Sequence, residues 1–159
     1  FTATSRIGEV QDALADFWTV KSVLVWDKGE AGTVGDLASY NWNWEPIMFA
    51  MKGRRPILGP RRRSIYRYDW GSAKRRTEIN RDNDTHPMVK PVGLMRWLIA
   101  GSTEPGEVVL DPFAGSGTVA KAARDMGRRC ISIELEEKYC EAAVGRLMRD
   151  PMRNGDATQ

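Results

Sequence analysis

The sequence has few of the residues that build disulfide frameworks and metal sites. It contains two cysteines, Cys130 and Cys140, and a single histidine, His86, among 159 residues. Secreted scaffolds use an even, clustered set of cysteines, and zinc sites use Cys and His at short spacing. Because neither pattern is present and the acidic residues form no clustered ligand pattern, we expect buried, reduced thiols and no bound metal.

Long apolar runs are also missing. No stretch approaches the roughly 18 consecutive apolar residues that a membrane-spanning helix needs, and no charged-then-apolar signal segment opens the chain. We therefore expect a soluble cytoplasmic protein with no membrane partner. The first residue is Phe1 rather than Met, so we expect translation to start upstream of it.

The net charge of +3 is too small to indicate a nucleic-acid partner by itself, but its distribution is uneven. Eleven cations face two acids between Lys52 and Arg81, which leaves the rest of the chain net negative. Residues 54–85 form a basic segment that is rich in Pro, Gly, Arg and Asp and has no amphipathic pattern. We predict that this basic segment is an excursion from the core of one domain spanning 1–159.

Hydrophobic periodicity predicts an α/β fold. The expected elements are a helix at 9–18, strands at 22–26 and 47–51, a helix at 89–101, a strand at 108–110, a helix at 118–126, a strand at 129–134 and a helix at 137–149. The last four form a βαβ unit followed by a helix. Because both of its strands are continuously apolar, we expect a parallel sheet covered on both faces.

A glycine-rich turn follows the strand at 108–110. A Cβ at Gly115 or Gly117 would block the approach of a ligand to the backbone, so an adenosine-containing ligand is the first hypothesis. Glu134 lies 17 residues after Gly117, at the expected carboxyl end of the next strand. An acid there can accept hydrogen bonds from both hydroxyls of a ribose.

Two other interpretations use the same residues. The turn also satisfies the loose dinucleotide pattern of nicotinamide and flavin enzymes, but those folds need a second mononucleotide half, and only 25 residues follow Glu134. The turn could also be a plain strand-to-helix connection with an ordinary surface Glu.

Asp111-Pro-Phe-Ala-Gly-Ser-Gly-Thr118 resembles the cofactor motif of the DNA N6-adenine and N4-cytosine methyltransferases. The stretches at 25–28, 45–53, 86–91 and 133–139 resemble further motifs of that family, so the resemblance covers nearly the whole chain. Their order is that of the subgroup in which the catalytic segment comes first, a recognition region follows and the cofactor motif comes last. The resemblance implies a class I (Rossmann-like) S-adenosylmethionine-dependent methyltransferase fold, incomplete in this chain.

The same resemblance implies S-adenosylmethionine as cofactor and supplies a set of binding residues. The turn would wrap the methionine end, Glu134 would hold the ribose, Leu135 would lie near the adenine, and His86 and Lys90 would border the pocket. Met88 stands where the family has Thr or Ser. The complete cofactor set is Asp111, Pro112, Phe113, Ala114, Gly115, Ser116, Gly117, Thr118, Glu134, Leu135, His86 and Lys90.

The catalytic tetrapeptide of that family is absent. It reads Asp, Asn or Ser, then Pro-Pro, then Tyr or Phe, and none of the eight prolines here is followed by another. The family uses it to hold a flipped base and to localise the lone pair of its amino nitrogen. We expect a preceding segment of the same protein to supply it; a separate partner chain and an inactive homologue that binds cofactor or DNA are the alternatives.

The basic segment lies where the family places its target-recognition region. Cations interleaved with aromatic residues suit phosphate contacts and base stacking, while a solvated basic loop is the alternative. The expected DNA-binding residues are Arg54, Arg55, Arg61, Arg62, Arg63, Arg67, Trp70, Lys74, Arg75 and Arg76. The short region suggests a small recognition site or help from the second subunit of a homodimer.

The predicted reaction is methyl transfer to an exocyclic amino group of double-stranded DNA. N6 of adenine is favoured over N4 of cytosine, although members of both kinds share these motifs. We expect an orphan enzyme or one in a restriction–modification or phage setting, in a bacterial or phage-infected cell. RNA as the substrate stays a minor alternative.

Overall fold

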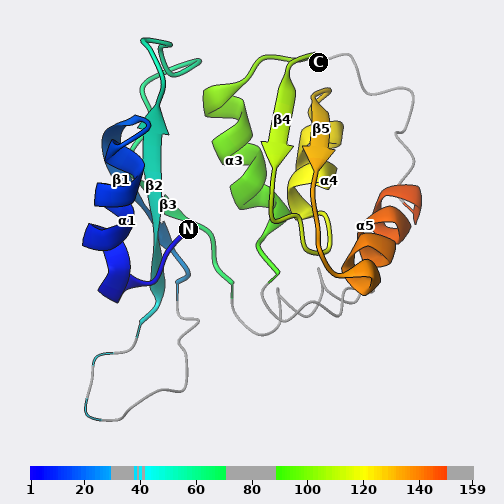
Figure 1. The fold of residues 1–159 in the computed structure, drawn as a ribbon, viewed down its shortest axis with the longest axis horizontal. Coiled ribbons are helices and arrows are strands. Elements are labelled where there is room, and N and C mark those ends of the chain that lie inside the picture. The colour runs from blue at the N-terminus through cyan, green and yellow to red at the C-terminus, as the bar shows by residue number, and fades with distance from the viewer. Residues whose placement is uncertain (30–37, 39, 41, 71–88, 150–159) are drawn as a thin grey trace. The chain divides into compact units, whose positions relative to one another are not determined.

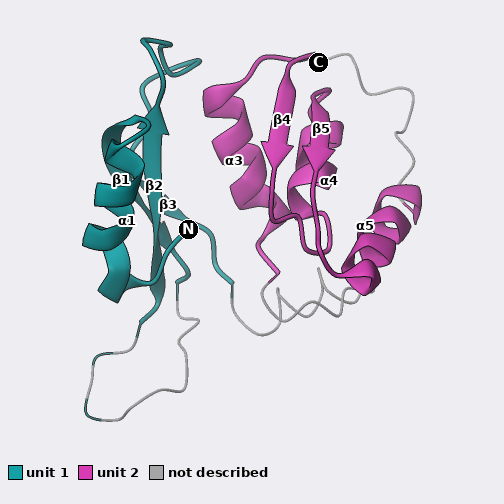
Figure 2. Ribbon diagram, in the orientation of Figure 1, with its two compact units in different colours: residues 1–75 teal, residues 76–159 magenta. Residues whose placement is uncertain are grey.

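The structure, a computed structural model, describes residues 1–29, 38, 40, 42–70 and 89–149. The chain divides into two compact units, Phe1–Arg75 and Arg76–Gln159 (Figure 2). Each unit has its own small sheet. No helix in the described part is both long enough and apolar enough to cross a membrane.

Unit 1 is a three-stranded sheet with a helix beside it (Figure 1). Its elements are the 3-10 helix η1 (Thr4–Arg6), α1 (Ile7–Ala15), β1 (Thr19–Asp27), β2 (Trp44–Met51) and β3 (Ile65–Arg67). The strand order is β2-β1-β3, with β2 antiparallel and β3 parallel to β1. A register shift between Val20 and Ser22 leaves one extra residue in β1, as in a β-bulge.

The core of unit 1 is centred on Trp26, which is only 1% exposed. Its ring packs edge-on against Phe1 and Trp70, with centroids 6.5 and 6.4 Å away. The indole N–H donates a hydrogen bond to the Tyr68 carbonyl at 3.1 Å, so the polar atom of this buried side chain has a partner.

Part of the basic segment belongs to this core, which corrects the prediction that all of it lies outside. Residues of β3 pair with the carboxyl end of β1, with Tyr66 opposite Trp26. Trp70 follows β3 and is 7% exposed, and its backbone N–H donates to the Lys28 carbonyl at 3.1 Å. Trp70 is thus enclosed in the core of unit 1, and a role of its ring in base stacking would need the ring to leave that core.

Unit 2 has the predicted α/β arrangement. Its elements are α3 (Val92–Ser102), β4 (Val108–Asp111), α4 (Thr118–Asp125), β5 (Arg129–Ser132) and α5 (Glu137–Arg149). β4 and β5 pair in parallel, with α3 and α4 packed against each other (Figure 1). Most buried apolar side chains of unit 2 come from these two helices, and they include Leu94, Met95, Ile99, Ala122 and Ala123.

Local chemistry explains where the elements of unit 2 begin and end. The helix expected from Val89 starts at Val92, because a residue before proline is disfavoured in the helical region and Lys90 precedes Pro91. Beyond α4, Gly127 has φ +71° and Arg128 N–H donates to the Ala123 carbonyl at 2.8 Å. This Schellman arrangement satisfies the last carbonyls of the helix.

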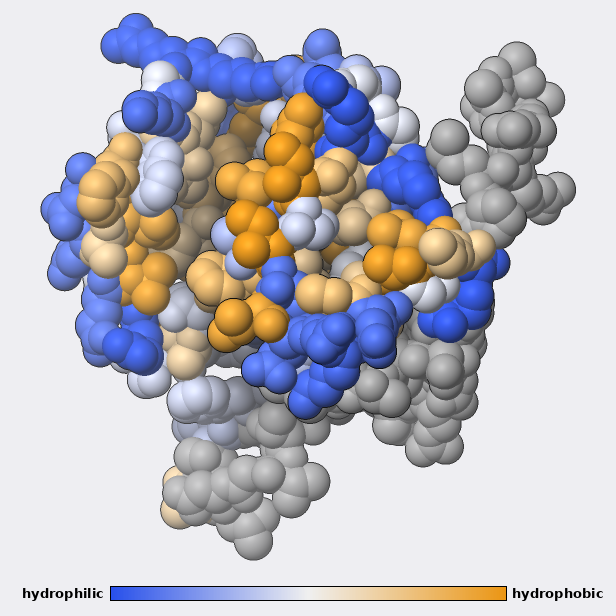
Figure 3. Space-filling model, turned by 45° about the vertical axis from the view of Figure 1, so that its right-hand side comes forward, coloured by the Kyte–Doolittle hydropathy of each residue, from blue (hydrophilic) through white to orange (hydrophobic). Residues whose placement is uncertain are grey.

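One face of the β4–β5 pair is open, which corrects the expectation that helices cover both faces. Alternate residues of the pair point to this face, and Val108, Leu110, Ile131 and Ile133 are 44–60% exposed. Figure 3 shows hydrophobic side chains gathered on the surface, flanked by hydrophilic ones. A parallel sheet is normally buried on both sides, so this face has the chemistry of an interior surface.

Candidate functional site

The predicted cofactor turn connects β4 directly to α4. Gly115 and Gly117 have φ values of +51° and +78°, in the left-handed region that glycine adopts without strain. The Ala114 N–H donates to the Ile133 carbonyl at 2.9 Å, which ties the turn to the chain leaving β5. Residues 114–118 of the turn are buried within unit 2.

Glu134 holds this turn together. One carboxylate oxygen accepts the Gly115 N–H at 2.7 Å. The other accepts the N–H groups of Leu135 and Glu136 at 2.9 and 3.0 Å, just before α5. The structure thus brings together the turn and the acid that the sequence singled out, and it gives the acid a backbone-ordering role that spacing alone did not predict.

Asp111 ends β4 beside Glu134. Its partly buried carboxyl accepts the Phe113 N–H at 3.2 Å. Burial raises the pKa of Asp111 above its ordinary value; the Phe113 hydrogen bond lowers it, and the charge of Glu134 raises it again. Two carboxyl groups at the ends of neighbouring parallel strands therefore create a site that favours a cation over an anion.

We expect Asp111→Asn to stabilise the ligand-free protein at neutral pH. The pKa of Asp111 is higher in the folded protein than in the unfolded chain, where it is about 4. The carboxyl group therefore stabilises the fold below the unfolded pKa, and this contribution is lost as the pH rises through the native pKa. The variant removes that loss, so its unfolding free energy should exceed the wild-type value at pH 7.

Urea denaturation of both proteins at neutral and acid pH measures this effect. The difference should shrink in acid, where the wild-type carboxyl is protonated too. Asp12→Asn, at an exposed carboxyl of α1, is the control and should show no such pattern. A less stable Asp111→Asn protein at pH 7 contradicts the expectation.

The remaining predicted cofactor residues occupy different surroundings. Phe113 and Leu135 are 89% and 94% exposed, so two large apolar side chains flank the carboxyl groups and face solvent. Lys90 is half-buried and lies two residues before α3. His86 lies outside the described residues.

Helix α5 contacts the turn at two points that the sequence did not reveal. A Cβ built on Gly117 would meet the Ala143 Cβ at 2.8 Å, so the helix packs almost directly on the glycine. One turn later, the 2%-exposed Arg146 donates to the Thr118 hydroxyl at 2.7 Å. Ala143 and Arg146 are three positions apart and therefore lie on the same face of α5. This spacing alone is a weak sequence signal, because the packing of α5 on α4 determines what that face contacts.

Most described cations of the basic segment are exposed. They are Arg54, Arg55, Arg61, Arg63 and Arg67, with Arg62 half-buried. Arg67 forms an ion pair with Asp69 at 3.3 Å. Lys74, Arg75 and Arg76 lie outside the described residues, so contact of this segment with DNA remains a proposal.

Two other stretches that resemble motifs of the family, 25–28 and 45–53, pair with each other in unit 1. In the β1–β2 register Trp26 faces Glu45, and Lys28 Nζ lies 3.2 Å from a Glu45 carboxylate oxygen and 5.0 Å from the Trp26 ring centroid. Pairing across the hairpin places these charges together, which their sequence separation does not predict.

Neither metal binding nor a disulfide appears in the described part of the chain. No group of three His, Cys, Asp or Glu residues there could hold a metal ion. Cys130 and Cys140 are free thiols, half-buried rather than fully buried as expected. Burial raises the pKa of the Cys130 thiol, a hydrogen bond with Ser132 lowers it, and the Asp111 charge raises it.

The family model described as DNA methylase matches residues 3–145. Type II methyltransferase M.SmaI of Serratia marcescens is 29% identical over 150 residues, covering 84% of this chain and 48% of that protein. DNA adenine methyltransferase YhdJ of Escherichia coli is 28% identical, covering 82% and 53%. Type II methyltransferase M.HinfI of Haemophilus influenzae is 31% identical, covering 89% and 42%. The chain thus spans about half the length of these relatives.

Solved structures match the fold. The M1.HpyAVI–SAM complex has a TM-score of 0.75 and 27% identity over 92% of this chain and 72% of that one. The cytosine-N4-specific PvuII DNA methyltransferase has a TM-score of 0.70 over 87% and 55%, and its 18% identity shows likeness of fold alone. The predicted class I methyltransferase fold is therefore confirmed.

Proposed function

Since the chain belongs to the DNA methylase family, we propose that it forms the cofactor-binding part of an enzyme that methylates an exocyclic amino group of DNA, using S-adenosylmethionine. The observation that carries the proposal is the turn at 111–118, whose Gly115 N–H is bonded to Glu134. The names of the relatives support DNA methylation as the class of reaction. The geometry of the turn supports S-adenosylmethionine as its ligand.

The chemistry of the site suits S-adenosylmethionine. This ligand has a sulfonium and an ammonium group, which favour the neighbouring carboxyl groups of Asp111 and Glu134. Its ribose hydroxyls are donors for a carboxylate, and its adenine is a flat ring suited to exposed apolar side chains such as Phe113 and Leu135. The M1.HpyAVI–SAM complex, similar to this chain, adds support.

We assign N6 of adenine as the preferred target. YhdJ, a relative with 28% identity, is named a DNA adenine methyltransferase, whereas the cytosine-specific neighbour is 18% identical. The exposed arginines of the basic segment are proposed to contact DNA phosphates, because their positive charges lie on the surface of the protein.

The catalytic segment is proposed to lie outside these 159 residues, in the same polypeptide or in a partner chain. Support comes from the absence of a Pro-Pro tetrapeptide and from relatives about twice as long. The open apolar face of the β4–β5 pair adds a surface that a further α/β segment could cover.

Transfer of a labelled methyl group from S-adenosylmethionine to double-stranded DNA tests this function. We expect the 159-residue chain to bind the cofactor without transfer. The intact protein, whose mass and peptides are read by mass spectrometry, should contain the tetrapeptide and produce N6-methyladenine on nucleoside analysis.

Three results would change the assignment. Transfer by the 159-residue chain alone would place catalysis within it. An intact protein that binds cofactor but has no tetrapeptide and no transfer would indicate a binding module. Failure of the intact protein to bind the cofactor would overturn the proposal.

A further inference from the structure

Helix α5 packs against the glycine turn, which is also hydrogen-bonded to the chain that leaves β5. Arg146 is the buried charge of this contact, and its Nη1 lies 2.7 Å from Thr118 Oγ1, across 28 residues of sequence. Thr118 is the first residue of α4 and follows Gly117, the last glycine of the turn. A shift of Thr118 would therefore move the turn itself.

We propose that Arg146 is a positioning residue for cofactor binding: through Thr118 it holds the turn at 111–118 in the conformation that receives S-adenosylmethionine. The inference rests on the proposed function. It assigns a role to a residue that the cofactor motif does not include. Arg146 acts on the ligand through Thr118, whose backbone continues directly from Gly117.

The energetics of the contact support positioning over simple stabilisation. Arginine is almost never fully buried unless it is paired, because removing its charge from water is costly. Its partner here stands at the N-terminus of α4, where the helix dipole is positive and repels a cation. A hydrophobic side chain could fill the space between α4 and α5 without either cost, whereas it could not fix the Thr118 hydroxyl.

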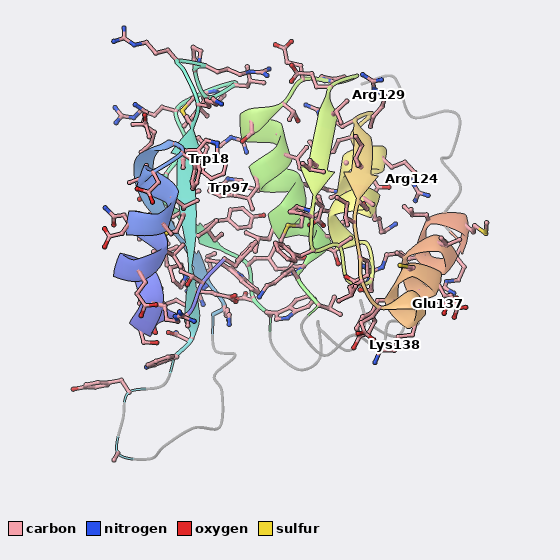
Figure 4. All side chains as sticks on the ribbon, in the orientation of Figure 1. Trp18, Trp97, Arg124, Arg129, Glu137 and Lys138 are labelled. Atoms are coloured by element: carbon pink, nitrogen blue, oxygen red, sulfur yellow. The ribbon has the colours of Figure 1, made fainter. Side chains whose placement is uncertain are left out.

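The same two helices offer a matched control. Arg124 lies on α4 (Figure 4), six residues beyond Thr118 in the sequence. Its guanidinium donates a hydrogen bond to the Leu147 carbonyl of α5. It also joins α4 to α5 through a guanidinium, but at a distance from the turn. Replacing each arginine by glutamine thus separates loss of helix packing from loss of turn positioning.

Cofactor affinity of the intact protein, measured by titration calorimetry, tests the role. Arg146→Gln should weaken S-adenosylmethionine binding about tenfold, the effect of losing one hydrogen bond to a charged group. Arg124→Gln should change it less than about twofold, as a change remote from the ligand. Both variants should lower the urea midpoint of unfolding.

Milder variants identify the route. Thr118→Val removes the accepting hydroxyl, so its effect on affinity should not multiply with that of Arg146→Gln. Arg146→Lys keeps a donor and should recover part of the affinity. If the two arginine variants weaken binding equally, or the Thr118 and Arg146 effects multiply, Arg146 has only a structural role. A wild-type protein that binds no cofactor overturns the proposed function together with this inference.

Discussion

Replacing Gly117 by alanine is expected to lower the free energy of unfolding by about 3 kcal/mol, from left-handed strain of about 1–2 kcal/mol and overpacking of about 1–3 kcal/mol. The residue has φ +78°, and the added Cβ would stand 2.8 Å from the Ala143 Cβ. Because Ala143 belongs to α5, the helix must move away from the turn. Cofactor binding should weaken with it.

Gly106→Ala is the matched control. This glycine has φ +85°, but a Cβ there would meet nothing within 4 Å, so only the backbone strain of about 1–2 kcal/mol remains. Urea denaturation of the two variants isolates the contribution of close packing. Equal losses of stability would show that α5 does not press on the turn.

Removing the Glu134 carboxylate should have the largest effect on the cofactor. Glu134→Ala deletes the acceptor of three backbone N–H groups, those of Gly115, Leu135 and Glu136. Each hydrogen bond to a charged group contributes about 1.5–3 kcal/mol. We expect S-adenosylmethionine affinity to fall at least about 100-fold, because the turn loses its anchor and the proposed ribose contact is lost as well.

Two variants refine this result in the same calorimetric titration. Glu136→Ala removes an exposed carboxylate two residues after Glu134 and should leave the affinity for S-adenosylmethionine nearly unchanged. Glu134→Gln keeps one acceptor oxygen and should lie between Glu134→Ala and wild type. If Glu134→Ala binds like wild type, Glu134 neither orders the turn for the ligand nor holds the ribose.

Local signals explain why the glycine turn and unit 2 were predictable. A buried strand followed by glycines and a helix is encoded within about thirty residues of a βαβ unit, where the period of apolar residues and the φ requirements of Gly115 and Gly117 agree. Glu134 could be placed because parallel strands end at the same edge of a sheet. The predicted strand pairing of β4 and β5 follows from the same rule.

Contacts between distant segments explain what was not predictable. Composition placed Trp70 on a basic surface, but the parallel pairing of β3 with β1 carries it into the core against Trp26. Arg146 was part of a correctly predicted helix, yet its direction depends on how α5 packs on α4. An amphipathic pattern identifies a helix, but it does not identify the residue that a buried arginine of that helix will bind.

The open sheet of unit 2 has a consequence for handling the protein. In the described part of the chain, β4 hydrogen-bonds to β5 on one side only, and the exposed face of the β4–β5 pair carries valine, leucine and isoleucine side chains. An apolar strand edge is a template for pairing with other chains. Until that surface is covered, each freshly synthesised copy meets its neighbours with a ready site for aggregation, so folding yield should depend on protein concentration.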